Sequence, residues 1–136
     1  MIIDIHAHIV DPVYMARLRD VLSLEAQHTD DGKTLYRHDG YTIAWERPDM
    51  YDIDHRLREM DRKGSDIRVL SLSTPNVYCW PEGGQVGVTR DINDALAVLC
   101  RSHPDRFVGL GSLPLVDVEA SLAELDRCVG ELGMKG

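Results

Sequence analysis

Short apolar segments alternate with amphipathic segments along the chain. Residues Met1–Ile9, Ile67–Ser73 and Phe107–Leu113 are short and apolar, which is typical of buried β-strands. A further apolar segment begins at Met134. The pattern therefore predicts three strands and the start of a fourth.

A helical pattern precedes or follows each predicted strand. The first helix is expected over residues 52–63, with Asp52 as its N-cap and Gly64 as its stop. Further helices are expected over residues 89–102 and 117–132. The apolar stripes expected to face the core are Ile53, Leu57 and Met60; Ile92, Ala95, Leu96 and Leu99; and Leu122, Leu125, Val129 and Leu132. This alternation predicts an α/β fold with right-handed βαβ crossovers and a parallel sheet.

Residues 10–51 do not fit this alternation. The segment is far longer than the ~2 to 6 residues that usually join a strand to its helix. It contains a possible helix at Val13–Leu24 and a predicted hairpin, in which Lys33–Arg37 pairs with Tyr41–Trp45 around the turn residues Asp39 and Gly40. Such an insertion is either a lid or binding loop, or a surface ornament.

Composition narrows the class of protein. The chain has 136 residues, of which 43% are hydrophobic and 28% charged, so one compact soluble domain is expected. No segment reaches the roughly 18 apolar residues of a membrane helix. The formal charge of -8 argues against binding to nucleic acid. Three widely spaced cysteines suggest no disulfide framework, and the N-terminus does not resemble a signal peptide, so we expect a cytoplasmic location.

The first predicted strand ends in a His-Ala-His sequence. Alternate residues of a strand face the same side, so His6 and His8 are expected to point together, with Asp4 on the same face and Ile3, Ile5 and Ala7 facing a helix layer. Neutral imidazoles suit Zn²⁺ and other first-row divalent metals such as Mn²⁺. Alternatively, the two histidines are only hydrogen-bonded. A catalytic zinc usually has three protein ligands, and the remaining histidines are expected at the surface: His28, His38, His55 and His103.

Four motifs in sequence order resemble one family. They are the opening IDIHAHIVDP, residues 56–75 (RLREMDRKGSDIRVLSLSTP), residues 93–115 (NDALAVLCRSHPDRFVGLGSLPL) and residues 122–136 (LAELDRCVGELGMKG). Together they resemble the amidohydrolase-2 branch of the amidohydrolase superfamily, nearest to the aminocarboxymuconate-semialdehyde decarboxylases. The resemblance implies a (β/α)8 barrel with one metal, usually zinc, held by the HxH pair and by a histidine and an aspartate of later strands. Of these ligands, only His6 and His8 can be assigned in this chain.

The same resemblance implies an incomplete barrel. A full (β/α)8 barrel takes ~250 residues, whereas three strand–helix units are recognisable here. We therefore expect residues 1–136 to form the N-terminal half of such a barrel, with an insertion at about residues 10–51. A half barrel exposes an edge strand, so we expect a homo-oligomer or pairing with a C-terminal half, and no activity in the isolated chain.

Four further residues are candidates for a substrate pocket. The resembling decarboxylases hold the substrate carboxylate with an arginine from the insertion, and Arg47 is a better candidate for this role than Arg37. Tyr78 and Trp80 follow the second strand in a loop that would face the pocket. The alternative is that the arginines are merely exposed and that the aromatic rings pack beneath a lid.

Small and sulfur-containing residues have simpler interpretations. Gly109 and Gly111 lie within a predicted strand and lack the third glycine of a phosphate loop, so close packing against a neighbour explains them. Cys100 and Cys128 are expected to be inert buried thiols. Cys79 has no recognisable base beside it.

The sequence therefore favours the N-terminal part of a metal-dependent non-oxidative decarboxylase of a small unsaturated or aromatic carboxylic acid. A hydrolase or hydratase with the same site is the first alternative, because fold does not choose among these reactions. A phosphoesterase that also opens with HxH is a weaker one. The non-enzymatic alternative is an inactive half domain that binds a partner chain.

Overall fold

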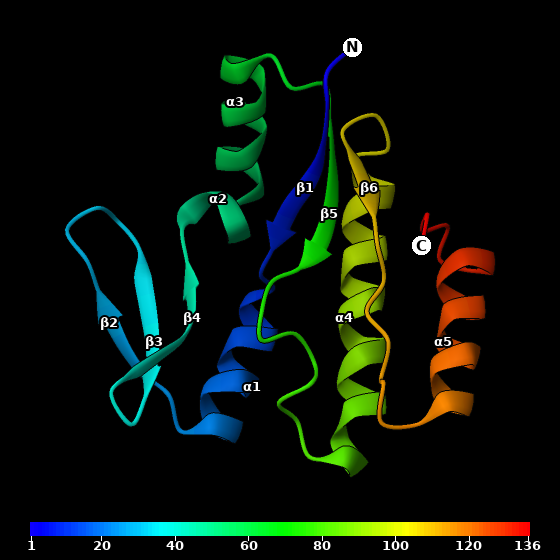
Figure 1. Cartoon of the computed structure of the whole chain (residues 1–136). Coiled ribbons are helices and arrows are strands. Elements are labelled where there is room, and N and C mark those ends of the chain that lie inside the picture. Colours follow the sequence, from blue (N-terminus) through cyan, green and yellow to red (C-terminus); the bar gives the residue numbers. More distant parts are fainter.

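A parallel three-stranded sheet lies at the centre of the molecule (Figure 1). The computed structural model describes residues 1–136. The sheet contains β1 (Ile3–Ile9), β5 (Ile67–Leu72) and β6 (Phe107–Gly109) in the order β1-β5-β6. The predicted α/β class with a parallel sheet is therefore confirmed.

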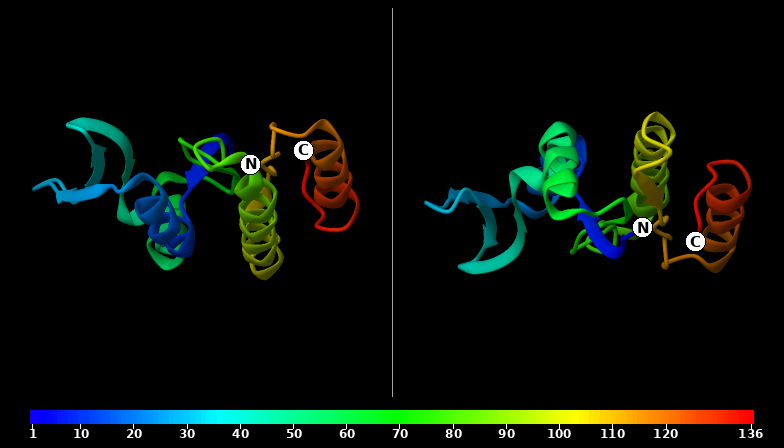
Figure 2. Two further views of the ribbon diagram at one scale, coloured as in Figure 1. Left: turned by 90° about the horizontal axis from the view of Figure 1, so that it is seen from below. Right: turned by 90° about the horizontal axis from the view of Figure 1, so that it is seen from above.

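Three helices follow these strands in turn: α3 (Ile53–Lys63), α4 (Glu82–Ser102) and α5 (Val118–Gly130). Helices α3 and α4 lie on one side of the sheet (Figure 2). The predicted caps of α3 are present, because Asp52 accepts a hydrogen bond from the His55 backbone and Gly64 ends the helix in the left-handed conformation. Local signals therefore set both ends of α3.

Helix α4 begins at Glu82, seven residues before the predicted start at Thr89. Glycines at positions 83, 84 and 87 are poor helix formers, which led the prediction to begin too late. Tertiary contacts outweigh this propensity. The buried Gln85 side chain donates to the Trp80 carbonyl oxygen at 3.1 Å, and Gly84 packs closely on the Trp80 ring. Contacts with the preceding loop thus stabilise the first turns.

The segment between β1 and α3 forms a small unit of its own. Two strands pair around a turn in which Asp39 and Gly40 both have positive φ, as two-residue hairpins require. A third strand, not predicted from the sequence, pairs with the first of them. The elements of the segment are α1 (Pro12–Leu22), β2 (Glu25–His28), β3 (Thr34–His38), β4 (Tyr41–Glu46) and α2 (Pro48–Tyr51).

The buried apolar residues form two clusters. One lies beneath α1 and includes Tyr14, Leu18, Leu72 and Trp80. The other joins the sheet to α4 and α5 and includes Met60, Leu70, Leu96, Phe107 and Cys128. Gly109 and Gly111 pack against this second cluster, and a Cβ on Gly111 would lie only 2.7 Å from Cys128 Sγ. The close packing predicted for these glycines is confirmed.

The predicted buried stripe of α5 is wrong for three of its four residues, whereas Leu132, just beyond the helix, packs against the second cluster. Leu122, Leu125 and Val129 are 53%, 36% and 51% exposed, whereas Glu124 and Cys128 are buried. On the side of α5 that faces α4, the buried Glu124 accepts a hydrogen bond from Asn93 at 2.7 Å. The apolar stripe of α5 therefore faces solvent.

The end of the third predicted strand also differs from expectation. Strand β6 stops at Gly109, and no strand begins at Met134. The C-terminal residues nevertheless run beside this segment, because Lys135 donates to the Gly109 carbonyl and Gly111 donates to the Gly136 carbonyl. No helix of the structure is both long enough and apolar enough to cross a membrane.

A β-bulge interrupts β1 beside its histidines. Asp4 pairs with Arg68, and Ala7 pairs with Leu70, so β1 contains one more residue than β5 over the same length. Beyond the bulge His8 pairs with Ser71. Because Arg68 and Ser71 are three residues apart on a strand, Asp4 and His8 belong to opposite faces of the sheet.

Candidate metal centre and its cleft

The imidazole rings of His6 and His8 converge. Their Nε2 atoms lie 3.0 Å apart, and the rings meet edge to face with centroids 4.7 Å apart. Two nitrogens bound to a tetrahedral zinc at the usual Zn–N distance would lie roughly 3.3 Å apart. The separation therefore fits two neighbouring ligands of one divalent cation.

The expected composition of the two faces of β1 needs correction. Asp4 does not share the histidine face, because the bulge places it beside Arg68, whose Nε lies 3.5 Å from Asp4 Oδ2. Ile3 and Ile5 are not covered by helices but are 48% and 77% exposed. No third His, Cys, Asp or Glu side chain joins the imidazole pair. A metal held here would need additional ligands, since catalytic zinc usually has three from protein.

His8 is held from two directions. Ser71 Oγ of the neighbouring strand lies 3.3 Å from its Nδ1 atom. The Arg56 guanidinium, on α3, donates to the His8 carbonyl oxygen at 2.6 Å. Sequence reasoning missed both residues, because neither contact follows from spacing along the chain. The pairing of His8 with Ser71 depends on the bulge.

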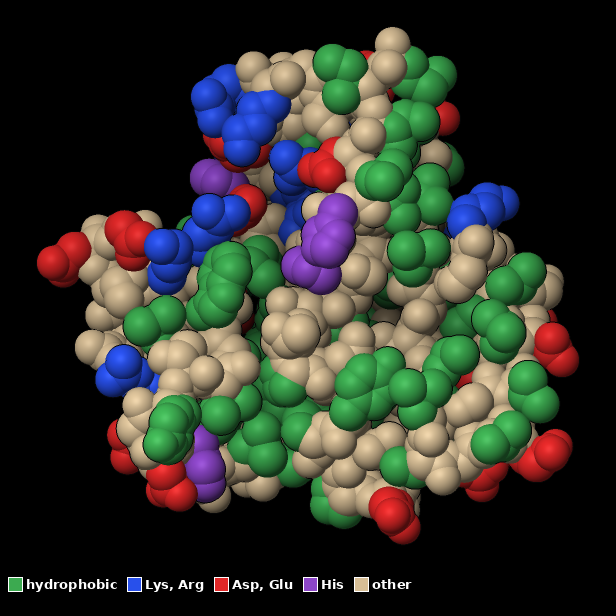
Figure 3. Space-filling model, in the orientation of Figure 1, with side chains coloured by type: hydrophobic (Ala, Val, Ile, Leu, Met, Phe, Trp, Pro, Cys, Tyr) green, Lys and Arg blue, Asp and Glu red, His purple; other side chains and the backbone are tan.

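The imidazole pair opens on a cleft of about 290 Å³ along the free edge of β1. We call it the histidine cleft. Figure 3 shows histidine side chains beside a hollow that has lysine and arginine side chains on its rim. The cleft is lined by His6, His8, Arg47, Asp49, Arg56 and Arg68, with Asp4, Ala7, Trp45, Met50 and Lys63.

Arg47 lies in this cleft, as the sequence led us to expect of a substrate arginine. It precedes α2, its Nη2 lies 3.1 Å from an Asp49 carboxylate oxygen, and its guanidinium lies 5.7 Å from the Trp45 ring centroid. Both interactions leave part of the guanidinium free, because the side chain is 46% exposed. The structure thus brings Arg47 to the histidines, while Arg37 does not line the cleft.

The cleft has a local positive charge in an acidic chain. Four cationic side chains line it, Arg47, Arg56, Lys63 and Arg68, against two carboxylates. Arg56 and Arg68 are 2% and 7% exposed, and the Nε atom of each lacks a hydrogen-bond partner. Burial, and the nearby charge of Arg68, lower the pKa of Arg56 to about 10. The lining therefore favours an anionic ligand.

Tyr78 and Trp80 lie apart from the histidine cleft. Trp80 is only 9% exposed and packs on Tyr14, with ring centroids 5.4 Å apart, inside the cluster beneath α1. The packing role that the sequence left open thus describes Trp80. Tyr78 is 49% exposed. Its expected role in lining a pocket stays a prediction.

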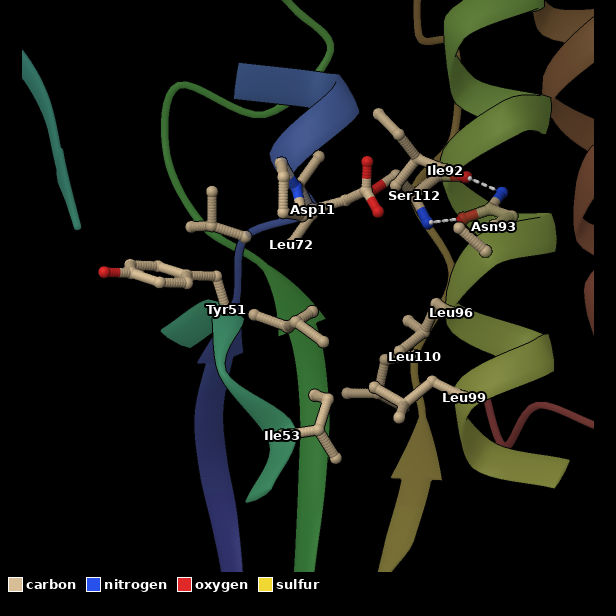
Figure 4. A pocket seen from close by; sticks show the side chains of 14 residues that line it. Asp11, Tyr51, Ile53, Leu72, Ile92, Asn93, Leu96, Leu99, Leu110 and Ser112 are labelled. Carbon is tan, nitrogen blue, oxygen red and sulfur yellow. Dashed lines mark hydrogen bonds between the residues drawn. The ribbon is translucent and has the colours of Figure 1, made fainter. Parts of the chain in front are cut away.

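A second cavity lies on the helix side of the sheet (Figure 4). It measures about 150 Å³ and is mostly apolar, with Ile53, Leu72 and Leu99 among its lining residues. Its one carboxylate, Asp11, accepts hydrogen bonds from the first turn of α1. The cavity contains none of the predicted site residues, and we interpret it as a gap in helix packing.

The sequence pattern that characterises the amidohydrolase family matches residues 3–136, which is almost the whole chain. The chain belongs to the amidohydrolase family. The parallel sheet with its HxH strand β1, and the helices beside it, are therefore parts of an amidohydrolase fold. The resemblance seen in the four sequence motifs is confirmed.

Three amidohydrolase relatives are decarboxylases. Gamma-resorcylate decarboxylase of Rhizobium sp. (strain MTP-10005) is 42% identical over 84 residues, which cover 61% of this chain and 26% of the relative. The 2-amino-3-carboxymuconate-6-semialdehyde decarboxylase of Dictyostelium discoideum is 32% identical over 139 residues, covering 98% of this chain and 38% of the relative.

The third relative is a crystal structure. Dihydroxybenzoic acid decarboxylase from Polaromonas sp. JS666, with bound manganese and the inhibitor 2-nitroresorcinol, superposes with a TM-score of 0.71 at 30% identity. The alignment covers 97% of this amidohydrolase chain and 36% of that protein. The chain thus spans between about a quarter and two fifths of the length of these relatives.

Proposed function

We propose that this chain supplies the metal-binding first strand and the N-terminal part of a (β/α)8 barrel of a metal-dependent non-oxidative decarboxylase. The observation that carries the proposal is the 3.0 Å approach of two imidazole Nε2 atoms at a cleft lined with cations. The proposed substrate is a small unsaturated or aromatic carboxylic acid. Three relatives that carry decarboxylase names support this choice over a hydrolase or hydratase.

His6 and His8 would provide two ligands of a divalent cation through their Nε2 atoms. Such a cation lowers the pKa of bound water and stabilises developing negative charge. Manganese in a relative supports Mn²⁺, and imidazole ligands suit Zn²⁺ equally. Both Mn²⁺ and Zn²⁺ are therefore proposed as the cation of this site.

Arg47 is the proposed substrate-binding residue. Its guanidinium is partly exposed at the mouth of the cleft and can accept a carboxylate in a two-pronged hydrogen bond. The deeper cations Arg56 and Arg68 add attraction for the anion without needing to touch it. Charge attraction is needed because the chain as a whole is acidic.

We further propose that the chain alone lacks turnover and associates with more polypeptide, either a second copy or a partner that completes the barrel. Strand β1 has a partner on one edge only, and its residues Ile3 and Ile5 are exposed. The exposed stripe of Leu122, Leu125 and Val129 adds a second apolar surface. Both surfaces favour association.

Metal binding provides the direct test. We expect the purified chain to bind Mn²⁺ or Zn²⁺ in equilibrium dialysis, and the double variant His6→Ala/His8→Ala to lose at least tenfold in affinity. Removing two ligands of one cation removes most of its binding energy. A competing chelator should strip the metal without unfolding the chain.

The matched control also removes two histidines. His28→Ala/His38→Ala changes two exposed imidazoles of the antiparallel sheet that are not among the lining residues of the cleft. It should bind metal as the wild type does. Equal loss in both double variants, or no metal bound by the wild type, would refute the proposed site.

A further inference from the structure

We propose that Ser71 is a positioning residue for His8: its hydroxyl oxygen accepts a hydrogen bond from Nδ1–H and so keeps the Nε2 lone pair directed at the position shared with His6. The proposal deepens the proposed metal site and rests on it for its consequence. Its structural content, the tautomer of one imidazole, can be tested without metal.

The distance of 3.3 Å between Ser71 Oγ and His8 Nδ1 is set by main-chain pairing. His8 and Ser71 are direct partners in the parallel ladder, so the hydroxyl cannot drift along the strand. Ser71 makes no other side-chain hydrogen bond. Its oxygen is therefore available to the ring and to nothing else nearby.

Two proton arrangements satisfy the contacts of His8. In the first, Nδ1–H donates to Ser71, and the His8 Nε2 lone pair accepts from Nε2–H of His6. In the second, the serine hydroxyl donates to Nδ1, and His8 carries its proton on Nε2. Only the first leaves His8 Nε2 without a proton, as a ligating nitrogen must be; for both rings to bind a cation, His6 must also release its Nε2 proton when the cation binds. Metal-bound histidines generally donate their other N–H in this way.

The main chain of His8 is fixed independently of its ring. The carbonyl oxygen of Ile9 accepts a hydrogen bond from the Ser73 backbone, just after the end of β5, so the carbonyl of His8, one residue earlier, points to the free edge. There it accepts the 2.6 Å hydrogen bond from the buried Arg56 guanidinium. Loss of the Ser71 hydroxyl should therefore change the ring tautomer and leave the strand in place.

The first experiment is long-range ¹H–¹⁵N NMR of the metal-free chain in alkaline buffer. We expect His8 to carry its proton on Nδ1 in the wild type. Ser71→Ala should shift the ring toward the Nε2–H form or a mixture, and Ser71→Thr should restore Nδ1–H. Ser73→Ala removes a hydroxyl two residues further along the chain, just after β5, and should change nothing.

The second experiment measures the dissociation constant for Mn²⁺ in the same four proteins. Ser71→Ala should weaken binding by about tenfold, the usual effect of removing an outer partner of a metal ligand. Ser71→Thr and Ser73→Ala should stay close to the wild type. Unchanged far-ultraviolet circular dichroism establishes that each variant is folded.

The outcomes separate this inference from the function it deepens. If the wild type binds no metal but Ser71→Ala changes the tautomer, the positioning role holds and the metal proposal fails. If the wild type binds Mn²⁺ and Ser71→Ala alters neither tautomer nor affinity, the positioning role is overturned. An Nε2–H tautomer of His8 in the wild type would overturn it as well.

Discussion

The histidine cleft and a polar cluster between α4 and α5 differ in how their groups are satisfied. We call the second group the clamp; it consists of Asn93, Asp94, Ser112, Glu124 and Arg127. Both contain buried charged or polar side chains. The clamp uses its hydrogen-bonding capacity within the chain, whereas the cleft leaves part of its own unused.

Every buried polar side-chain atom of the clamp has a partner. Asn93 donates to the Ser112 carbonyl at 2.9 Å, accepts from the Ser112 backbone N–H at 2.8 Å, and donates to Glu124 at 2.7 Å. Arg127 donates to Glu124 through two nitrogens, at 2.9 and 2.7 Å, and to Asp94 at 2.5 Å. Such a saturated network stabilises a fold and offers nothing to a ligand.

The cleft contrasts with this arrangement at each point. The Nε atoms of Arg56 and Arg68 have no hydrogen-bond partner, and the guanidinium of Arg47 is half exposed. Buried donors without partners are costly, so they are uncommon in a region that serves stability alone. The comparison teaches that unused donors, rather than the number of charges, set the cleft apart from the clamp.

The largest effect is expected for Asn93→Ala, which breaks the clamp at its centre. The change leaves the Ser112 backbone groups without their partner and removes a donor to Glu124, all in a buried setting. We expect a loss of about 3 kcal/mol in the free energy of unfolding, measured with urea. Asp126→Ala, on the exposed side of α5, should cost little. A loss below about 1 kcal/mol for Asn93→Ala would contradict the role of the clamp.

A smaller, pH-dependent effect is expected for Glu124→Gln. Burial favours the neutral acid, but hydrogen bonds from Arg127 and Asn93 and the charge of Arg90 outweigh it and lower the pKa of Glu124 from 4.5. The depressed pKa contributes stability above about pH 4.5, which is lost as the pH falls through the folded-state value.

Glu124→Gln should therefore cost about 2 kcal/mol at pH 7, where a hydrogen-bonded charge is removed. The difference from the wild type should shrink when unfolding is measured at successively lower pH below 4.5. Arg127 and Asp94 remain in both proteins, so the comparison isolates the carboxyl group of Glu124. A difference that stays constant with pH would show that Glu124 is not held ionised.

The smallest effect on stability is expected in the cleft. Arg47→Ala removes a half-exposed ion pair with Asp49. We expect the free energy of unfolding to change by no more than about 0.5 kcal/mol. Binding of benzoate, as a simple carboxylate probe followed by NMR titration, should nevertheless weaken by about tenfold. Arg58→Ala, an exposed arginine outside the cleft, should leave both quantities unchanged. A large loss of stability with unaltered benzoate binding would make Arg47 a structural residue.

Much of the fold could be predicted because its signals are local. Asp52 and Gly64 set the ends of α3 through contacts with their own neighbours, and Asp39 and Gly40 set the hairpin turn through their backbone preferences. The outward stripe of α5 could not be predicted in this way. The buried Glu124 accepts a hydrogen bond from Asn93 of α4, and a helical pattern cannot show a partner that lies on another helix.

The candidate site shows the same division. The pairing of His6 and His8 follows from their spacing, and Arg47 was expected near them from a resemblance to known enzymes. Arg56 and Ser71 come from other elements, so only the folded chain brings them to His8. For Trp80 the loop position left both a pocket and a packing role open, and the folded chain packs the ring on Tyr14, apart from the cleft.

Because β1 has an extra residue, the side of the sheet that the two imidazoles face does not follow from the alternation of side chains at the start of the strand. Deleting Ile5 would restore a regular ladder and rotate either the Asp4–Arg68 pair or the histidines to the other side. A motif search sees the same His-Ala-His letters in both cases. Whether the two rings can act as a ligand pair therefore depends on the side of the sheet they face, and a single irregular backbone position sets that side.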